Sequence, residues 1–231
     1  MYSNDVVILC GGQGSRLRPV FSDPKILFPV GDEPFLIKLY NQFRTITSGN
    51  IILCTGYKSE KVEAFCDVNG LDVIISKEQS PAGTGGAILT ALCHIKTDYF
   101  VCVNGDTLIS QADMIAFFKN STMIKAKKNI ILACKASHRN ERYGHVDTSP
   151  FLRIKKIDEQ GSAIIDAFSG LSLIKREILK CLTFDNVSFE KLILKLRIPH
   201  DKVSKIYLKS EFYDYGTVNA ARSLNEKFNI T

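Results

Sequence analysis

The sequence predicts an α/β fold in which helices flank a mostly parallel central sheet, extended in the C-terminal half by mixed strands. Short apolar and β-branched runs alternate with helix-like stretches up to about residue 138, as expected of consecutive βα units. These runs are apolar on both faces, which is typical of parallel strands covered by helices on both sides. After residue 139 the alternation loosens into strand-like stretches joined by Ser-Pro and Gln-Gly turns, and this change predicts the mixed extension.

The parallel part is expected to contain strands at five short apolar runs, which cover residues 6–10, 51–55, 73–76, 99–103 and 130–135. Helices are expected between them, at 34–46, 58–67, 85–94 and 111–120. Pro34 is expected at the first helical position, because its fixed φ suits a helix start and its missing N–H is not needed there.

The C-terminal half adds expected strands at 144–146, 152–157 and 163–174. Ser188 is a preferred N-cap residue and predicts a helix over 189–196. A strand at 205–208 and a helix from Val218 onward follow. Because no repeat or linker interrupts the chain and 45% of it is hydrophobic, residues 1–231 are expected to form one domain that buries roughly 70% of its unfolded surface.

The charge pattern favours a small anionic ligand over a nucleic acid. The chain has 30 Lys and Arg residues against 24 Asp and Glu residues, and this excess is spread along the chain. A nucleic-acid footprint would need basic residues gathered on one face. The dense basic group at Lys125, Lys127 and Lys128 is interpreted as a solvated face, so no nucleic-acid partner is expected.

The cysteines and the N-terminus predict a cytoplasmic protein. Cys10, Cys54, Cys102 and Cys134 lie in apolar runs, and no C-x-x-C spacing occurs among the seven cysteines. Such cysteines usually behave as small buried hydrophobes in a reducing compartment, without structural zinc. No charged leader with an apolar core precedes the first strand. No apolar run approaches the ~20 residues that cross a bilayer, so no signal peptide and no membrane partner are expected.

A glycine-rich loop, Gly-Gly-Gln-Gly-Ser-Arg-Leu at 11–17, follows the first strand. A strand, a glycine loop and a helix form a phosphate-binding arrangement, because glycines let backbone N–H groups close on an anion. The dinucleotide fingerprint would need glycine at Leu17, and a P-loop would need Lys followed by Ser or Thr. Neither pattern fits. Arg16 could grip phosphate oxygens bidentately, and the alternative is a tight turn with a surface arginine.

Two segments together carry a family resemblance. The loop at 11–17, followed by Pro-Lys-Ile-Leu-Phe-Pro-Val at 24–30, closely resembles the opening signature of the sugar-1-phosphate nucleotidylyltransferases. The resemblance continues at 83–87, 104–106 and 213–217, so it spans nearly the whole chain. Within the family the chain looks most like the guanylyltransferases acting on mannose 1-phosphate or D-glycero-D-manno-heptose 1-phosphate. Arg-Tyr-Gly at 142–144 and Ser-Phe-Glu at 188–190 resemble the heptose branch.

The resemblance implies a Rossmann-like, GT-A-like nucleotidyltransferase fold and a magnesium-dependent reaction. GTP and a sugar 1-phosphate would be the substrates, with heptose 1-phosphate first and mannose 1-phosphate second, and pyrophosphate would leave as a GDP-sugar forms. A nucleotide-binding half would cover about 1–138 and a sugar-phosphate-binding half about 139–231. The sequence leaves a homodimer open.

The expected catalytic residues are Arg16, Lys25 and Asp106. Nucleotidyl transfer needs the nucleophile and the leaving group to be aligned, and it needs the negative charge on the phosphate oxygens to be neutralised. Arg16 would hold the β- and γ-phosphates, and Lys25 could reach a phosphate held by the glycine loop. Asp106 follows a strand at the carboxyl edge, where a hard carboxylate suits magnesium. The resemblance implies that Asp214 binds the same ion.

The resemblance implies that the nucleotide base contacts Glu78, which lies five residues before Gly83. A carboxylate can accept from both the ring N–H and the exocyclic amine of guanine, whereas uracil and thymine would present a carbonyl. The alternatives are that Glu78 points to solvent or that Gln79 makes the contact. The expected nucleotide-binding residues are Leu9, Gly11, Gly12, Gly14, Ser15, Arg16, Glu78, Gly83 and Thr84.

The sugar side departs from the family pattern. Many relatives carry a Glu-Lys pair where this chain has Glu159 and Gln160, so Lys155 or Lys156 substitutes for the lysine or the sugar phosphate is held more weakly. An asparagine near Phe168 is also lost. The four histidines show no metal-ligand spacing, and His145 is left open as a sugar contact because it lies in the segment that resembles the heptose branch. The expected sugar-phosphate-binding residues are Asn104, Tyr143, Gly144, Ser169 and Gly170.

Other functions remain open on the sequence. The chain could use UTP, CTP or dTTP, or it could transfer the nucleotide to a non-sugar phosphate such as phosphocholine. A non-catalytic module that binds nucleotides or nucleotide sugars is a third alternative, although pure binding would not need both Asp106 and Asp214.

Overall fold

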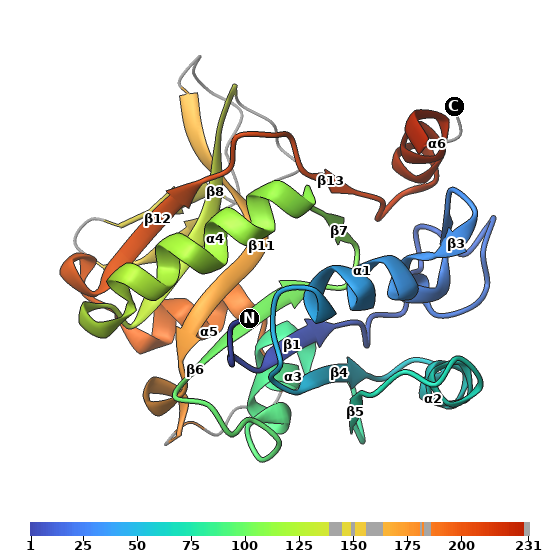
Figure 1. Ribbon diagram of the computed structural model, residues 1–231, viewed down its shortest axis with the longest axis horizontal. Coiled ribbons are helices and arrows are strands. Elements are labelled where there is room, and N and C mark those ends of the chain that lie inside the picture. Colours follow the sequence, from blue (N-terminus) through green and yellow to red (C-terminus); the bar gives the residue numbers. More distant parts are fainter. Residues whose placement is uncertain (139–144, 149–150, 156–163, 181, 183–185, 229–231) are drawn as a thin grey trace.

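The computed structural model describes residues 1–138, 145–148, 151–155, 164–180, 182 and 186–228 (Figure 1). Within these ranges nine strands form one sheet with the order β10-β9-β11-β6-β1-β4-β5, and β8 joins it through β11 and carries β12. Helices cover both faces. The α/β prediction is therefore confirmed, and the same sheet runs through both halves of the chain.

The parallel part of the sheet contains β1 (Val6–Leu9), β4 (Ile51–Thr55), β5 (Ile74–Lys77) and β6 (Tyr99–Asn104). β1 lies between β4 and β6, and it pairs with both in parallel. All five residues of β4 are buried, as expected of a strand covered on both faces. Because these strands are parallel, their carboxyl ends meet at one edge of the sheet, where ligands bind in open α/β sheets.

The mixed extension is built on the long strand β11 (Ile164–Lys175), which pairs with β6 in antiparallel fashion. β8 (Ile130–His138) lies on its other side, antiparallel to β11 and parallel to β12 (Val203–Tyr207). The hairpin of β9 (His145–Asp147) and β10 (Arg153–Lys155) completes the sheet. The β11–β8 register shifts between Phe168 and Ser172, close to Gly170, whose φ of +83° suits glycine.

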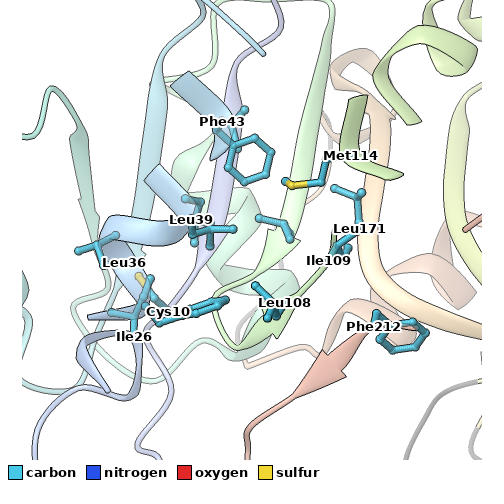
Figure 2. Close-up of a cluster of buried hydrophobic side chains, with 14 of the residues drawn as sticks. Cys10, Ile26, Leu36, Leu39, Phe43, Leu108, Ile109, Met114, Leu171 and Phe212 are labelled. Atoms are coloured by element: carbon cyan, nitrogen blue, oxygen red, sulfur yellow. The ribbon is translucent and has the colours of Figure 1, made fainter. Parts of the chain in front are cut away.

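The helices divide between the two faces. One face carries α1 (Phe35–Arg44), α2 (Ser59–Val68), α4 (Gln111–Ile124) and α6 (Val218–Phe228), and the other carries α3 (Gly83–Ala91) and α5 (Phe189–Leu196). Figure 2 shows the first core, where Leu39 of α1, Met114 of α4 and Leu171 of β11 are buried in one cluster. The short 3-10 helices are η1 (Lys25–Leu27), η2 (Lys125–Lys127), η3 (Arg176–Leu179) and η4 (His200–Lys202).

Two local predictions were wrong. Pro34 is the N-cap of α1 with ψ of 140°, and not its first helical residue, because it also ends β3 (Glu33–Pro34), which pairs with β2 (Pro29–Val30). The glycine loop leads into turns at 15–20 and not into a helix. In these turns the N–H groups of Leu17 and Arg18 both bond Gly14 O, at 2.9 and 3.0 Å.

Two further features concern the predictions on burial and membranes. Cys10, Cys54, Cys102 and Cys134 are buried and free of disulfides, as their apolar surroundings indicated. Burial raises the pKa of each of these thiols, so they stay protonated and behave as small hydrophobes. Among the residues with described positions, no helix combines the length and apolarity needed to cross a membrane.

Candidate active site

A cavity of about 700 Å³ opens at the carboxyl edge of the parallel strands. Its walls come from the segments that follow β1, β4, β5 and β6, together with the first turn of α3. Lys25, Asn104 and Asp106 also line it. Every residue expected to bind the nucleotide contributes to these walls, namely Leu9, Gly11, Gly12, Gly14, Ser15, Arg16, Glu78, Gly83 and Thr84.

The glycine loop forms one wall because its backbone bends back on the sheet. Gly14 has a φ of +59°, which suits glycine, and the buried side chain of Leu17 anchors the following turn in the core. A methyl group on Gly11 would lie only 3.1 Å from Gly56 N, so this position is also close to the loop after β4. The loop therefore reaches the cavity while Arg16 stays exposed to a ligand.

One ammonium and two carboxylates meet at the β6 end of the cavity. Lys25 Nζ forms an ion pair with Asp106 and lies 3.9 Å from Asp214 Oδ1. The side chains of Lys25, Asp106 and Asp214 remain 16%, 27% and 25% exposed, so a ligand can still reach them. Asp106 follows β6 directly, and Asp214 reaches it through β13 (Tyr213–Asp214), which pairs with β7 (Thr107–Leu108).

Gly216 has no side chain, and this lets the charged groups around it lie close together. A methyl group at Gly216 would lie 2.8 Å from Asp214 Oδ1 and 3.0 Å from Lys25 Nζ. It would also lie 3.5 Å from Arg16 Nη2. The three charged side chains expected from distant parts of the sequence are thus brought together around one glycine, which the sequence reasoning did not single out.

Tyr215 lies beneath this group and was also missed. Its side chain is fully buried, and its hydroxyl donates toward Gly105 O at 3.0 Å and Lys25 O at 3.2 Å. The motif at 213–217 contains this residue, but nothing in its spacing distinguishes a buried tyrosine from an exposed one.

The carboxylates of Asp106 and Asp214 fit a magnesium ion. Both form ion pairs with the same ammonium, so the two carboxyl groups lie in one small region at the β6 end of the cavity. In the part of the chain that the structure describes, no group of three or more His, Cys, Asp or Glu side chains could hold a metal alone. Magnesium commonly uses one or two carboxylates and completes its shell with phosphate oxygens and water, and this pair of carboxylates next to the glycine loop fits that preference.

Glu78 lies at the opposite end of the cavity, just after β5. Its side chain is partly buried between two glycines: methyl groups on Gly56 and Gly11 would lie 3.0 and 3.3 Å from its Oε2. Burial raises the pKa of Glu78, and a hydrogen bond from the Ala82 N–H acts in the opposite direction. Gln79 lines the same cavity but is exposed, so both residues are placed where a base could meet them.

The N-terminus of α3 is already occupied by the chain itself. Val187 O accepts from Gly85 N at 2.8 Å and from Gly86 N at 3.2 Å, while Thr84 Oγ1 accepts from Phe189 N at 2.8 Å. These N–H groups are therefore not open to a phosphate, although helix N-termini often bind one. The glycine loop after β1 lines the same cavity and also presents backbone N–H groups.

The sugar side is described in part. Gly170 packs against Asn104, since a methyl group on Gly170 would lie 2.5 Å from Asn104 Nδ2. Ser169 is buried, and its hydroxyl donates to Ala133 O at 2.9 Å. Unlike Asn104, Ser169 and Gly170 do not line the cavity. Several expected residues lie outside the described residues: Arg142, Tyr143, Gly144, Lys156, Glu159 and Gln160.

Comparison with known proteins adds independent findings. Residues 6–170 match the family model of the MobA-like NTP transferase domain. The chain is 32% identical over 216 residues to a D-glycero-alpha-D-manno-heptose 1-phosphate guanylyltransferase of Aneurinibacillus thermoaerophilus, covering 91% of this chain and 88% of that protein. A mannose-1-phosphate guanylyltransferase of Mycobacterium tuberculosis is 39% identical over 114 residues, or 48% of this chain and 32% of that protein.

A solved structure shows a similar fold. The crystal structure of HddC from Yersinia pseudotuberculosis complexed with GMP-PN has a TM-score of 0.78 to this chain at 28% identity. The match covers 99% of this chain and 100% of that chain, so the similarity extends over both halves.

Proposed function

The chain belongs to the MobA-like NTP transferase domain family, and from this premise we propose that it is a guanylyltransferase. It joins GTP to a sugar 1-phosphate, heptose 1-phosphate first and mannose 1-phosphate second, and it releases pyrophosphate as the GDP-sugar forms. Because the chain belongs to this family of NTP transferases, its reaction is nucleotidyl transfer. The choice of guanine and of the sugar is the part that we propose.

The order of the strands is the main observation in support of the proposal. β6, β1, β4 and β5 lie side by side, so the segments after them follow one another along the edge of the sheet. Glu78 follows β5, the glycine loop follows β1 and Asp106 follows β6. A nucleotide bound along this edge would have its base at Glu78, its phosphates over the glycine loop and its reacting phosphate near Asp106. The sugar 1-phosphate would then enter from the side of β11.

The charged residues fit in-line transfer. An oxygen of the sugar phosphate attacks the α-phosphorus of GTP, the bond from that phosphorus to the bridging oxygen breaks, and pyrophosphate leaves. Arg16 would hold the departing phosphates, and Lys25 would neutralise charge on the α-phosphoryl group. Asp106 and Asp214 would hold magnesium, which supplies charge neutralisation and a template for both substrates.

The names of similar proteins support guanine and the sugar class. Two relatives are guanylyltransferases acting on heptose 1-phosphate or mannose 1-phosphate, and the structure of HddC holds GMP-PN. Glu78 offers the acceptor pair that guanine needs. The heptose choice rests on 32% identity, so it needs a direct test.

A matrix of donors and acceptors tests the proposal. Pyrophosphate release is measured with GTP, UTP, CTP and dTTP against heptose 1-phosphate, mannose 1-phosphate, glucose 1-phosphate and phosphocholine, with and without magnesium. We expect the highest kcat/KM for GTP with heptose 1-phosphate. Equal or better use of another nucleotide would refute the guanine assignment, and turnover confined to phosphocholine would refute the sugar assignment. Nucleotide binding without turnover on any acceptor would favour a binding module.

A further inference from the structure

We propose that Tyr215 is a positioning residue: its buried hydroxyl fixes the loops that carry Lys25 and Asp106 relative to each other at the site of transfer. The proposal rests on the proposed function for its reaction, and it adds a residue whose role is to fix the geometry of the charged groups. Tyr215 itself does not touch the cavity, and it acts through the backbone of its neighbours.

The hydrogen bonds of Tyr215 join three separate segments of the chain. Its hydroxyl lies 3.2 Å from Lys25 O and 3.0 Å from Gly105 O, and its own N–H donates to Asp106 O at 3.3 Å. Tyr215 also follows Asp214 directly in the chain. One side chain and its backbone therefore connect the peptide units of all three residues that meet at the β6 end of the cavity.

The ring of Tyr215 is held so that the hydroxyl has little freedom. Its centroid lies 5.8 Å from that of Phe28 in a stacked arrangement and 4.9 Å from that of Phe35 in an edge-on arrangement. The Lys25 ammonium lies 5.3 Å above the ring, which adds an attraction between the cation and the aromatic face. Because the ring is fully buried against two aromatic side chains, the position of its hydroxyl is fixed relative to the core, and so are the loops that the hydroxyl bonds.

The hydroxyl acts as a donor, because both atoms that it contacts, Gly105 O and Lys25 O, are carbonyl oxygens that can only accept. Gly105 is confined from its other side as well, because a methyl group there would lie 2.8 Å from Leu9 O. The peptide before Asp106 is thus held between β1 and the hydroxyl of Tyr215.

Removing this hydroxyl is expected to slow the reaction more than it weakens nucleotide binding. In-line transfer depends on the placement of Lys25 and of the metal carboxylates, and a shift of ~1 Å in such groups can cost on the order of 10²-fold in rate. The hydrogen bonds of Tyr215 to Lys25, Gly105 and Asp106 reach neither the glycine loop nor Glu78. We therefore expect Tyr215→Phe to lower kcat roughly tenfold to a hundredfold, with KM for GTP changed by less than about threefold.

Tyr99→Phe is the matched control. The hydroxyl of Tyr99 also contacts two backbone carbonyl groups, Lys125 O at 2.7 Å and Lys128 O at 3.0 Å. Tyr99 begins β6, whereas Asn104 at the other end of this strand lines the cavity. Both variants should lower Tm by roughly 2–6 °C. A role confined to stability would leave kcat the same in both, measured well below Tm.

The magnesium requirement gives a second readout. If Tyr215 positions Asp106 and Asp214, the magnesium concentration for half-maximal rate should rise in Tyr215→Phe and stay unchanged in Tyr99→Phe. Equal kcat and equal magnesium requirement in the two variants would overturn the proposal. If Tyr215→Phe does not fold, Phe35→Leu loosens the ring while keeping the hydroxyl, and an unchanged kcat in that variant would also overturn it. Ratios to the wild type are taken with whichever donor and acceptor the wild-type protein uses, so failure of the guanine assignment leaves this test intact.

Discussion

Replacing Glu78 by glutamine is expected to lower kcat/KM for GTP and to narrow its advantage over UTP. The carboxylate can accept from two donors of guanine, whereas the amide offers one acceptor and turns its own donor toward the second. The loss is one hydrogen bond to a charged group, ~1.5–3 kcal/mol. At about 1.4 kcal/mol for each factor of ten, kcat/KM for GTP should fall roughly 10- to 150-fold, toward the lower end because Glu78 is only partly buried.

Steady-state rates of pyrophosphate release with GTP and UTP give this ratio directly. Gln79→Ala is the matched control, because Gln79 lines the same cavity and is the alternative contact. We expect it to leave the preference for GTP intact. An unchanged ratio in Glu78→Gln would refute the carboxylate argument, and a lost preference in Gln79→Ala would move the contact to that residue.

The pH dependence of kcat/KM for GTP should follow the protonation of the Glu78 carboxylate. Burial raises the pKa of Glu78 above its ordinary value, so the side chain takes up its proton at a higher pH than an exposed glutamate does. The protonated form loses an acceptor, and kcat/KM for GTP should therefore fall as the pH drops through this raised pKa. In Glu78→Gln this acid limb should disappear. The same acid limb in both proteins would assign it to another group.

Three further substitutions test the opposite end of the cavity. Asp106→Asn is nearly isosteric but removes a charge from the proposed magnesium site, so turnover should fall ~10²-fold or more. Full magnesium-dependent activity in the folded variant would remove Asp106 from the mechanism. Lys25→Ala should lower kcat more than it raises KM for GTP, and a change in KM alone would make Lys25 a binding residue. Gly216→Ala should fold, because the three atoms nearest to the new methyl group lie at the ends of the Arg16, Lys25 and Asp214 side chains. It should reduce kcat by displacing these side chains, and wild-type kinetics with an unchanged Tm would show that they can move aside without loss of function.

The sequence predicted well those elements that have strong local signals. β4 has the predicted bounds because a short, mostly apolar run between Asn50 and Gly56 leaves little choice of ends. α5 also has them, since Ser188 caps the helix by accepting from Lys191 N at 3.3 Å. The cavity-lining residues after β1 and β6 were found through the positions of the strands and the family resemblance.

The short pairings could not be predicted in this way. β7 and β13 have two residues each and lie about a hundred positions apart in the chain, so no periodicity marks them. The same pairing brings Asp214 to Asp106 and buries Tyr215. Residues whose roles depend on such a long-range contact, including Gly216, become visible only when the two segments are seen together.

The central position of β6 has a mechanical consequence. Its backbone is bonded on one side to β1, where Leu9 pairs with Asn104, and on the other side to β11, where Ser172 pairs with Cys102. Moving this strand relative to its neighbours would strain ladder bonds on both of its sides. The side of the cleft that would hold the nucleotide and the side that would hold the acceptor therefore share one stiff wall. A wall held in this way favours adjustment on binding in the loops at the rim over adjustment in the sheet.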